Sequence, residues 1–159
     1  MNNNLTESEA DAVLQHNITG HLGCCSDGVP YIVPLCYAYD GTAIYGRTYE
    51  GLKLRILRSN PNVCFQVEEI KDMITWKSVI CQGVFKELTG AEERNRALLV
   101  LQQRVTAMVS SEALRLSQYW PFSLKEMDEV KGILFHITIN SKTGRYHYKN
   151  LELPEDLFG

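Results

Sequence analysis

The segment 25–53, CSDGVPYIVPLCYAYDGTAIYGRTYEGLK, decides the fold that we expect for this 159-residue chain. Two turn dipeptides, Asp27-Gly28 and Asp40-Gly41, separate runs in which side chains alternate with a period of two. Such dipeptides favour type I′ hairpins, in which both central residues adopt positive φ. The segment therefore predicts a meander of antiparallel strands, with the strand before Asp40 paired to the strand after Gly41.

The second strand of this meander spans residues 31–39 and is largely apolar on both faces, so we expect it to be buried. Pro34 lies inside it, and proline removes one donor from the hydrogen-bond ladder. The strand should therefore be incompletely paired around Pro34. A kink in a barrel strand is one interpretation. The other is an exposed backbone edge that hydrogen-bonds to a flat heterocycle.

The third strand runs into a predicted helix through residues that suit an anion. These residues are Gly46, Arg47, Thr48, Gly51 and Lys53. Glycines permit close backbone approach, and free N–H groups at a helix start, together with cations and a hydroxyl, suit a phosphate. The glycine spacing matches neither a Walker nor a Rossmann motif. The alternative for Lys53 is a lysine in solvent on the helix surface.

The remaining elements follow one another irregularly. The pattern Thr6-x-x-Glu9 predicts a capped N-terminal helix, and the apolar face over 97–108 predicts the longest helix. Strands are expected over 62–69 and 76–88, and residues 141–144 (SKTG) should turn a last hairpin. Short strands joined by hairpins and interrupted by helices favour an antiparallel barrel with helical insertions.

Composition limits the classes of function. The formal net charge is −3, which provides no overall positive field for nucleic acid or an anionic membrane. The length suits one domain over residues 1–159. Five cysteines, an odd number without zinc-site spacing, predict reduced thiols and no metal. The first residues lack the apolar run of a signal peptide, so we expect a cytoplasmic protein.

Residue spacing assigns no catalytic residue. The four histidines have no carboxylate or cysteine partner at motif spacing, and no nucleophile elbow such as GxSxG is present. Trp76 and Ser78 open the strand 76–88. A tryptophan at such a position more often belongs to a core or an interface than to a ligand site.

Four segments in this order resemble those of a known family: DGVPYIVPLCYAYD, IYGRTYEGLK, NPNVCFQVEE and WKSVICQGVFKEL. Over about residues 10–148 the chain is similar to the pyridoxamine 5′-phosphate oxidase-like flavoproteins of the FMN-binding split-barrel fold. The resemblance is strongest to the branch that contains 5-nitroimidazole-resistance proteins. It implies a mainly β (α+β) fold, an antiparallel split β-barrel with peripheral helices, and bound FMN.

The resemblance also implies roles for single positions. The residues whose backbone it places against the isoalloxazine ring are Val33, Pro34 and Leu35. Those that it places at the FMN phosphate are Arg47, Thr48 and Lys53. Those on the strand that lines the rest of the site are Trp76 and Ser78. Members of the family are homodimers with two flavins at the subunit interface, so the partner chain is expected to contribute contacts, among them the segment 120–122.

Two departures from the family pattern restrict what the resemblance implies. Arg47 stands where many nitroimidazole-resistance proteins carry a histidine, so chemistry attributed to that histidine is not transferred. The C-terminal LELPEDLFG lacks the tryptophan and arginine with which pyridoxamine phosphate oxidases bind their substrate. The leading hypothesis is an FMN-dependent oxidoreductase that acts on a small planar acceptor such as a nitroimidazole. The alternative is a non-enzymatic module that binds flavin or haem.

Overall fold

Seven strands form one antiparallel sheet in the computed structural model, which describes residues 3–108 and 132–148. The strands are β1 (Thr19–Ser26), β2 (Val29–Cys36), β3 (Ala38–Tyr39), β4 (Ala43–Thr48), β5 (Asn62–Ile70), β6 (Trp76–Glu87) and β7 (Ile133–His147). The helices are α1 (Glu7–His16), α2 (Leu52–Ser59) and α3 (Ala91–Met108). The order of strands across the sheet is β2-β1-β5-β6-β7-β4-β3. Within the described residues, no helix has the length and apolar character needed to span a membrane.

The sheet curls so far that one residue connects its two edges. β2 and β3 are the edge strands, yet only Tyr37 separates them in the chain. The buried Tyr37 hydroxyl donates to the Leu14 carbonyl oxygen at 2.6 Å and so anchors this corner to α1. The expected split barrel with peripheral helices is confirmed. The expected single strand over residues 31–39 is wrong, because the chain leaves one edge of the sheet at Tyr37 and joins the other.

β2 is an edge strand, so the expectation that it is buried is also wrong. Ile32, Pro34 and Cys36 are exposed, and within the described residues β2 pairs with β1 alone. The incomplete pairing expected around Pro34 is confirmed. An edge position tolerates proline because its missing N–H can fall on the unpaired side of the strand.

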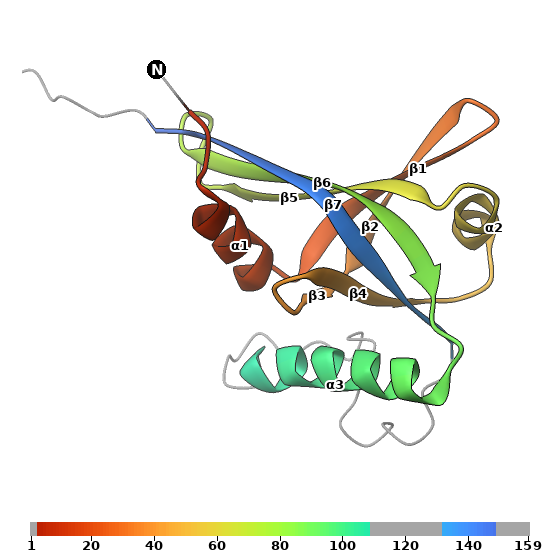
Figure 1. Cartoon of the computed structure of the whole chain (residues 1–159). Coiled ribbons are helices and arrows are strands. Elements are labelled where there is room, and N and C mark those ends of the chain that lie inside the picture. The colour runs from red at the N-terminus through yellow and green to blue at the C-terminus, as the bar shows by residue number, and fades with distance from the viewer. Residues whose placement is uncertain (1–2, 109–131, 149–159) are drawn as a thin grey trace, which may run out of the picture.

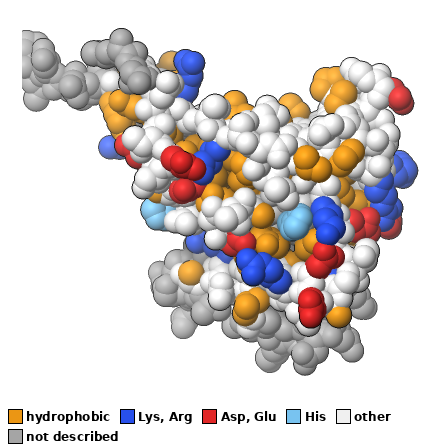
Figure 2. Space-filling model, in the orientation of Figure 1, with side chains coloured by type: hydrophobic (Ala, Val, Ile, Leu, Met, Phe, Trp, Pro, Cys, Tyr) orange, Lys and Arg blue, Asp and Glu red, His pale blue; other side chains and the backbone are white. Residues whose placement is uncertain are grey.

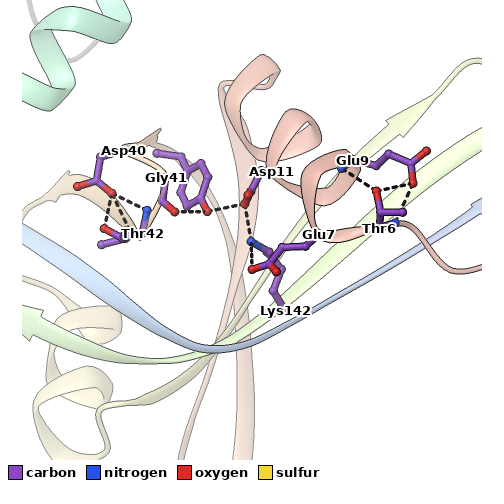
Figure 3. Close-up of polar contacts among 10 residues, drawn as sticks. Thr6, Glu7, Glu9, Asp11, Asp40, Gly41, Thr42 and Lys142 are labelled. Atoms are coloured by element: carbon purple, nitrogen blue, oxygen red, sulfur yellow. Dashed lines mark hydrogen bonds and ion pairs between the residues drawn. The ribbon is translucent and has the colours of Figure 1, made fainter.

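The two turn dipeptides differ in geometry. Asp27 (φ 51°) and Gly28 (φ 74°) both have positive φ, which confirms the turn between β1 and β2. In the second dipeptide only Gly41 has positive φ, at 97°, so a type I′ turn there is wrong. Asp40 Oδ1 instead accepts from both the backbone N–H and the hydroxyl of Thr42, each at 2.9 Å (Figure 3). This loop joins β3 to β4, and β4 does not pair with β2.

The C-terminal hairpin expected at residues 141–144 is wrong. β7 is one strand of 15 residues, and residues 141–144 pair with residues 79–82 of β6. Asn140 is left out of the register and forms a β-bulge opposite Gly83. Because β6 offers hydrogen-bond partners along this whole length, strand pairing overrides the turn-forming composition of SKTG.

The main hydrophobic core fills the inside of the curled sheet. α1 contributes Val13 and Leu14, and α2 contributes Leu54 and Leu57. Figure 1 shows α1 and α2 at opposite ends of the curled sheet, with α3 running below β3 and β4. A second cluster, which includes Tyr45 of β4, packs against α3 on the outer face. The outer face of β2, β1, β5 and β6 carries no helix within the described residues.

Polar contacts also hold α1 to the barrel (Figure 3). The expected capping box is confirmed, because the Thr6 hydroxyl accepts from Glu9 N–H at 3.2 Å and the Glu9 carboxylate accepts from Thr6 N–H at 2.7 Å. Asp11 accepts from the Tyr39 hydroxyl at 2.6 Å and pairs with the mostly buried Lys142 of β7. Burial alone raises the pKa of Asp11, but the hydrogen bonds from Lys142 and Tyr39 bring it below its usual value.

Candidate functional site

Lys53 occupies the first turn of α2, just after the chain leaves β4. Its side chain is half-buried, and in residues 3–108 and 132–148 its ammonium forms neither an ion pair nor a hydrogen bond. Burial lowers the pKa of Lys53, and the nearby Cys24 thiol acts in the opposite direction. A cation that is partly withdrawn from water without a counter-ion favours the binding of an anion.

The start of α2 offers backbone donors beside Lys53. Gly51 occupies the N-cap and has no side chain to accept from the first turn, so the leading N–H groups have no side-chain cap among the described residues. A Cβ added at Gly51 would meet no described atom within 4 Å. The backbone there is extended (φ 168°), so its conformation does not require glycine. Open space, helix N–H groups and a lysine together suit a phosphate.

Gly46 and Thr48 lie on the inner face of β4. A Cβ at Gly46 would lie 2.5 Å from the ring of the fully buried Phe135, so packing in the core explains this glycine without a cofactor. Thr48 is only 5% exposed, and its hydroxyl makes a long hydrogen bond of 3.4 Å to the Tyr49 carbonyl oxygen. A bond of this length leaves the hydroxyl available to a stronger acceptor.

Arg47 points to the opposite face of β4 from Thr48, because side chains alternate along a strand. On that face Tyr45 packs against α3, and the ring centroid of Tyr49 lies 5.4 Å from the guanidinium carbon of Arg47. The strand alone therefore does not aim Arg47 and Thr48 at one point. Arg47 therefore stays a predicted cofactor contact.

Lys53 lies on the same side of the barrel as the segment of β2 that is predicted to contact the ring. Burial raises the pKa of the Cys24 thiol, and the positive charge of Lys53 opposes this shift, so the two groups are close. Cys24 faces Tyr31 across the β1–β2 pair, and its Sγ donates to the Tyr31 carbonyl oxygen at 3.6 Å. Tyr31 precedes Val33 by two residues, which is about 7 Å along a strand. Lys53 and residues 33–35 thus lie on the same side of the barrel.

Pro34 and Ser78 share the outer face of the sheet but lie apart on it. The strand register places Pro34 opposite His21, His21 opposite Gln66, and Gln66 opposite Ile80. Ser78 follows the same face two residues from Ile80, and its Oγ accepts from the Gln66 side chain at 3.1 Å. Three strand spacings separate the β2 and β6 positions, roughly 14 Å. One chain therefore does not bring the two predicted residues together.

Trp76 begins β6 on the same face and stacks on His147 of β7, with ring centroids 6.3 Å apart. Its side chain is half-buried, which agrees with either an interface or a ligand contact. The segment 120–122, predicted to contribute from the partner chain, lies outside the described residues.

Sequence reasoning missed a charged cluster beside this junction. Arg58, in the last turn of α2, donates two hydrogen bonds to Glu50 at 2.9 Å and two to Glu87 at 3.0 Å. Glu50 lies between Thr48 and Lys53, so the cluster adjoins the candidate site. Separations of 8 and 29 residues match no motif, and no signal in the sequence marked this cluster.

Comparisons with known proteins agree with this architecture. The family model described as pyridoxamine 5′-phosphate oxidase matches residues 6–140. An uncharacterized protein of Rhizobium meliloti (strain 1021) is 30% identical over 151 residues, which cover 89% of this chain and 92% of that protein. The crystal structure of an FAD-binding protein from Mesorhizobium loti is 31% identical, with a TM-score of 0.69, and the match covers 92% of this chain and 96% of that one.

A more distant structure carries the name of the branch that the sequence favoured. It comes from Bacteroides thetaiotaomicron, is described as a 5-nitroimidazole antibiotic resistance protein, and is 17% identical with a TM-score of 0.67 over 90% of this chain and 86% of that one. At this identity it shows a shared fold, so the relation to that branch is distant. The family model matches most of the chain, and the split barrel agrees with it. The chain therefore belongs to the pyridoxamine 5′-phosphate oxidase family.

Proposed function

We propose that the protein binds FMN with its phosphate at the junction of β4 and α2. Lys53 carries this proposal, because its half-buried ammonium has no anionic partner in the described residues and lies beside uncapped helix N–H groups. A phosphate there gains charge-assisted hydrogen bonds from Lys53 and dipole-aligned donors from α2. Thr48 lies on the inner side of β4 and adds a hydroxyl. The backbone of Val33, Pro34 and Leu35 at the β2 edge then faces the ring.

FAD is the alternative cofactor, because the relative from Mesorhizobium loti is described as FAD-binding. Both flavins carry a phosphate next to the ribityl chain, and the junction suits that phosphate in either. FMN is favoured since the chain has no glycine-rich dinucleotide motif. Release of the flavin by heat, followed by chromatography, should yield FMN at about one per chain. Recovery of FAD would assign the alternative, and a protein that retains neither flavin after reconstitution would overturn the proposal.

We further propose that the flavin-loaded protein is an oxidoreductase acting on a small planar acceptor such as a nitroimidazole. The bound flavin supplies the redox chemistry, and the chain supplies binding and orientation. Anaerobic mixing with NADH or NADPH should bleach the flavin absorbance, and addition of the acceptor should restore it. A flavin that stays oxidised would favour a non-enzymatic binding module. An intense haem band in the spectrum would point to the other form of that alternative.

The outer face of β2, β1, β5 and β6 supports a homodimer. Ile32 is 69% exposed and Ile80 is 41% exposed, and Pro34 lies on the same uncovered face. We propose that a second copy covers this apolar surface, which the described residues of one chain leave in water. The partner's copy of the β6 start can then approach the β2 edge. That arrangement would supply Trp76 and Ser78 to a flavin ring that their own chain holds at a distance.

A further inference from the structure

Arg58 has a hydrogen-bond geometry that stability alone does not explain. One guanidinium binds two carboxylates in bidentate fashion, through the two bonds to Glu50 and the two bonds to Glu87. The side chain of Arg58 is 43% exposed and that of Glu50 is 66% exposed. Ion pairs this exposed contribute little to folding free energy, because water and salt screen them. A positional role is a better account of four aligned bonds.

The cluster of Glu50, Arg58 and Glu87 joins three parts of the fold around the proposed phosphate site. Glu50 belongs to the short loop between β4 and α2, Arg58 to the last turn of α2, and Glu87 to the end of β6. Figure 2 shows basic and acidic side chains side by side at the edge of the molecule where Figure 1 places α2. The guanidinium therefore connects the loop before Lys53 to the paired end of a long strand.

The loop between β4 and α2 depends on the hydrogen bonds of Arg58 for its position. No described side chain caps α2, and Gly51, which follows Glu50, has no described atom close to its Cβ position. A glycine without a cap or close packing leaves the backbone free to rotate. The direction of the leading N–H groups of α2, and of Lys53 on the same turn, then depends on where Glu50 is held.

We propose that Arg58 is a positioning residue for the flavin phosphate, acting through Glu50 with Glu87 as its anchor. The inference rests on the phosphate site proposed above and adds the element that sets its geometry. The hydrogen bonds to Glu87 and Glu50 also raise the pKa of Arg58, so the guanidinium keeps its charge.

The direction in which Glu50→Ala changes the affinity for FMN distinguishes a positioning role from a simple electrostatic effect. Glu50→Ala removes a negative charge near a bound phosphate, so a field effect alone would tighten FMN binding. Loss of positioning instead weakens FMN binding, by roughly tenfold if one charge-assisted hydrogen bond is misaligned. Riboflavin lacks the phosphate and should bind as it does to the wild type. Because the Glu50 side chain is mostly exposed, its truncation removes no core packing.

Titration of the apoproteins with FMN and with riboflavin, followed by flavin fluorescence, supplies the test. Arg58→Lys should also weaken FMN binding, because an ammonium keeps the charge but cannot bind two carboxylates in bidentate fashion. Glu93→Ala is the matched control, since Glu93 of α3 forms an exposed ion pair with Lys86, which points to the opposite face of β6 from Glu87, and it should change neither affinity.

Two failures are distinguishable in this experiment. A wild-type protein that binds FMN no better than riboflavin would overturn the phosphate site itself. A wild type that prefers FMN, with the same preference or a stronger one in Glu50→Ala, would overturn only the role of Arg58.

Discussion

Replacing Lys53 with methionine tests two effects of the half-buried ammonium, one on the stability of the free protein and one on the affinity for FMN. Methionine keeps most of the aliphatic stem and removes the ammonium. In the free protein, burial lowers the pKa of Lys53 and no described anion compensates for the lost hydration. The free energy of unfolding of the apoprotein should therefore stay level or rise in Lys53→Met. Chemical denaturation of the apoprotein measures this quantity.

The same substitution should weaken FMN binding. A hydrogen bond between a cation and a phosphate contributes about 1.5–3 kcal/mol, and a loss of about 2 kcal/mol is a roughly 30-fold weaker affinity. Riboflavin binding should not change, because riboflavin has no phosphate. Arg55→Met is the control, since Arg55 is an exposed cation on the same helix. Equal weakening toward FMN and riboflavin in Lys53→Met would refute the reasoning.

Lys53 also makes the preference for FMN depend on pH. Burial lowers its pKa from the usual 10.5 in the free protein, whereas a bound phosphate would favour the ammonium and raise it. A ligand that raises a pKa binds best below the pKa of the free protein and loses affinity as the pH rises through it. The FMN-to-riboflavin affinity ratio should thus be level near neutral pH and fall in the alkaline range below 10.5. Lys53→Arg, which stays charged, should remove the fall.

Four further substitutions have expected outcomes. Gly46→Ala should lower the free energy of unfolding by about 1–3 kcal/mol, because its Cβ would lie 2.5 Å from the Phe135 ring; Gly51→Ala should leave stability unchanged and weaken FMN binding. Ile80→Glu should convert a particle of about twice the 18.1 kDa chain mass into monomers by light scattering, and a wild type that is monomeric with tightly bound FMN would contradict the interface. Arg47→Ala should alter the flavin spectrum but keep the preference for FMN over riboflavin, and loss of that preference would place the guanidinium at the phosphate.

Local structure was predictable wherever a short pattern has a single physical cause. Thr6-x-x-Glu9 forms the capping box because the two side chains satisfy each other's backbone N–H groups. Asp27-Gly28 turns tightly because both residues tolerate positive φ. The break at Tyr37 was not predictable, since the alternation of side chains continues through it. Curling of the whole sheet separates β2 from β3, and no local pattern encodes that curvature.

The candidate site was predictable in residue type but not in geometry. The spacing of Gly51 and Lys53 indicated a helix start with a cation, and the structure places both there. Whether that cation is solvated depends on how α2 packs near Cys24 of β1, which is remote in the chain. The cluster around Arg58 likewise depends on segments that are remote in the chain, because Glu87 approaches Arg58 only when β6 is fully paired.

A crystal structure of the chain with FMN would test the central claim most directly. The account predicts that a phosphate oxygen lies about 3 Å from Lys53 Nζ and accepts hydrogen bonds from the leading N–H groups of α2. It also predicts that the isoalloxazine ring lies along the β2 edge beside Pro34. A phosphate bound elsewhere, with the Lys53 ammonium still without an anionic partner, would contradict the account.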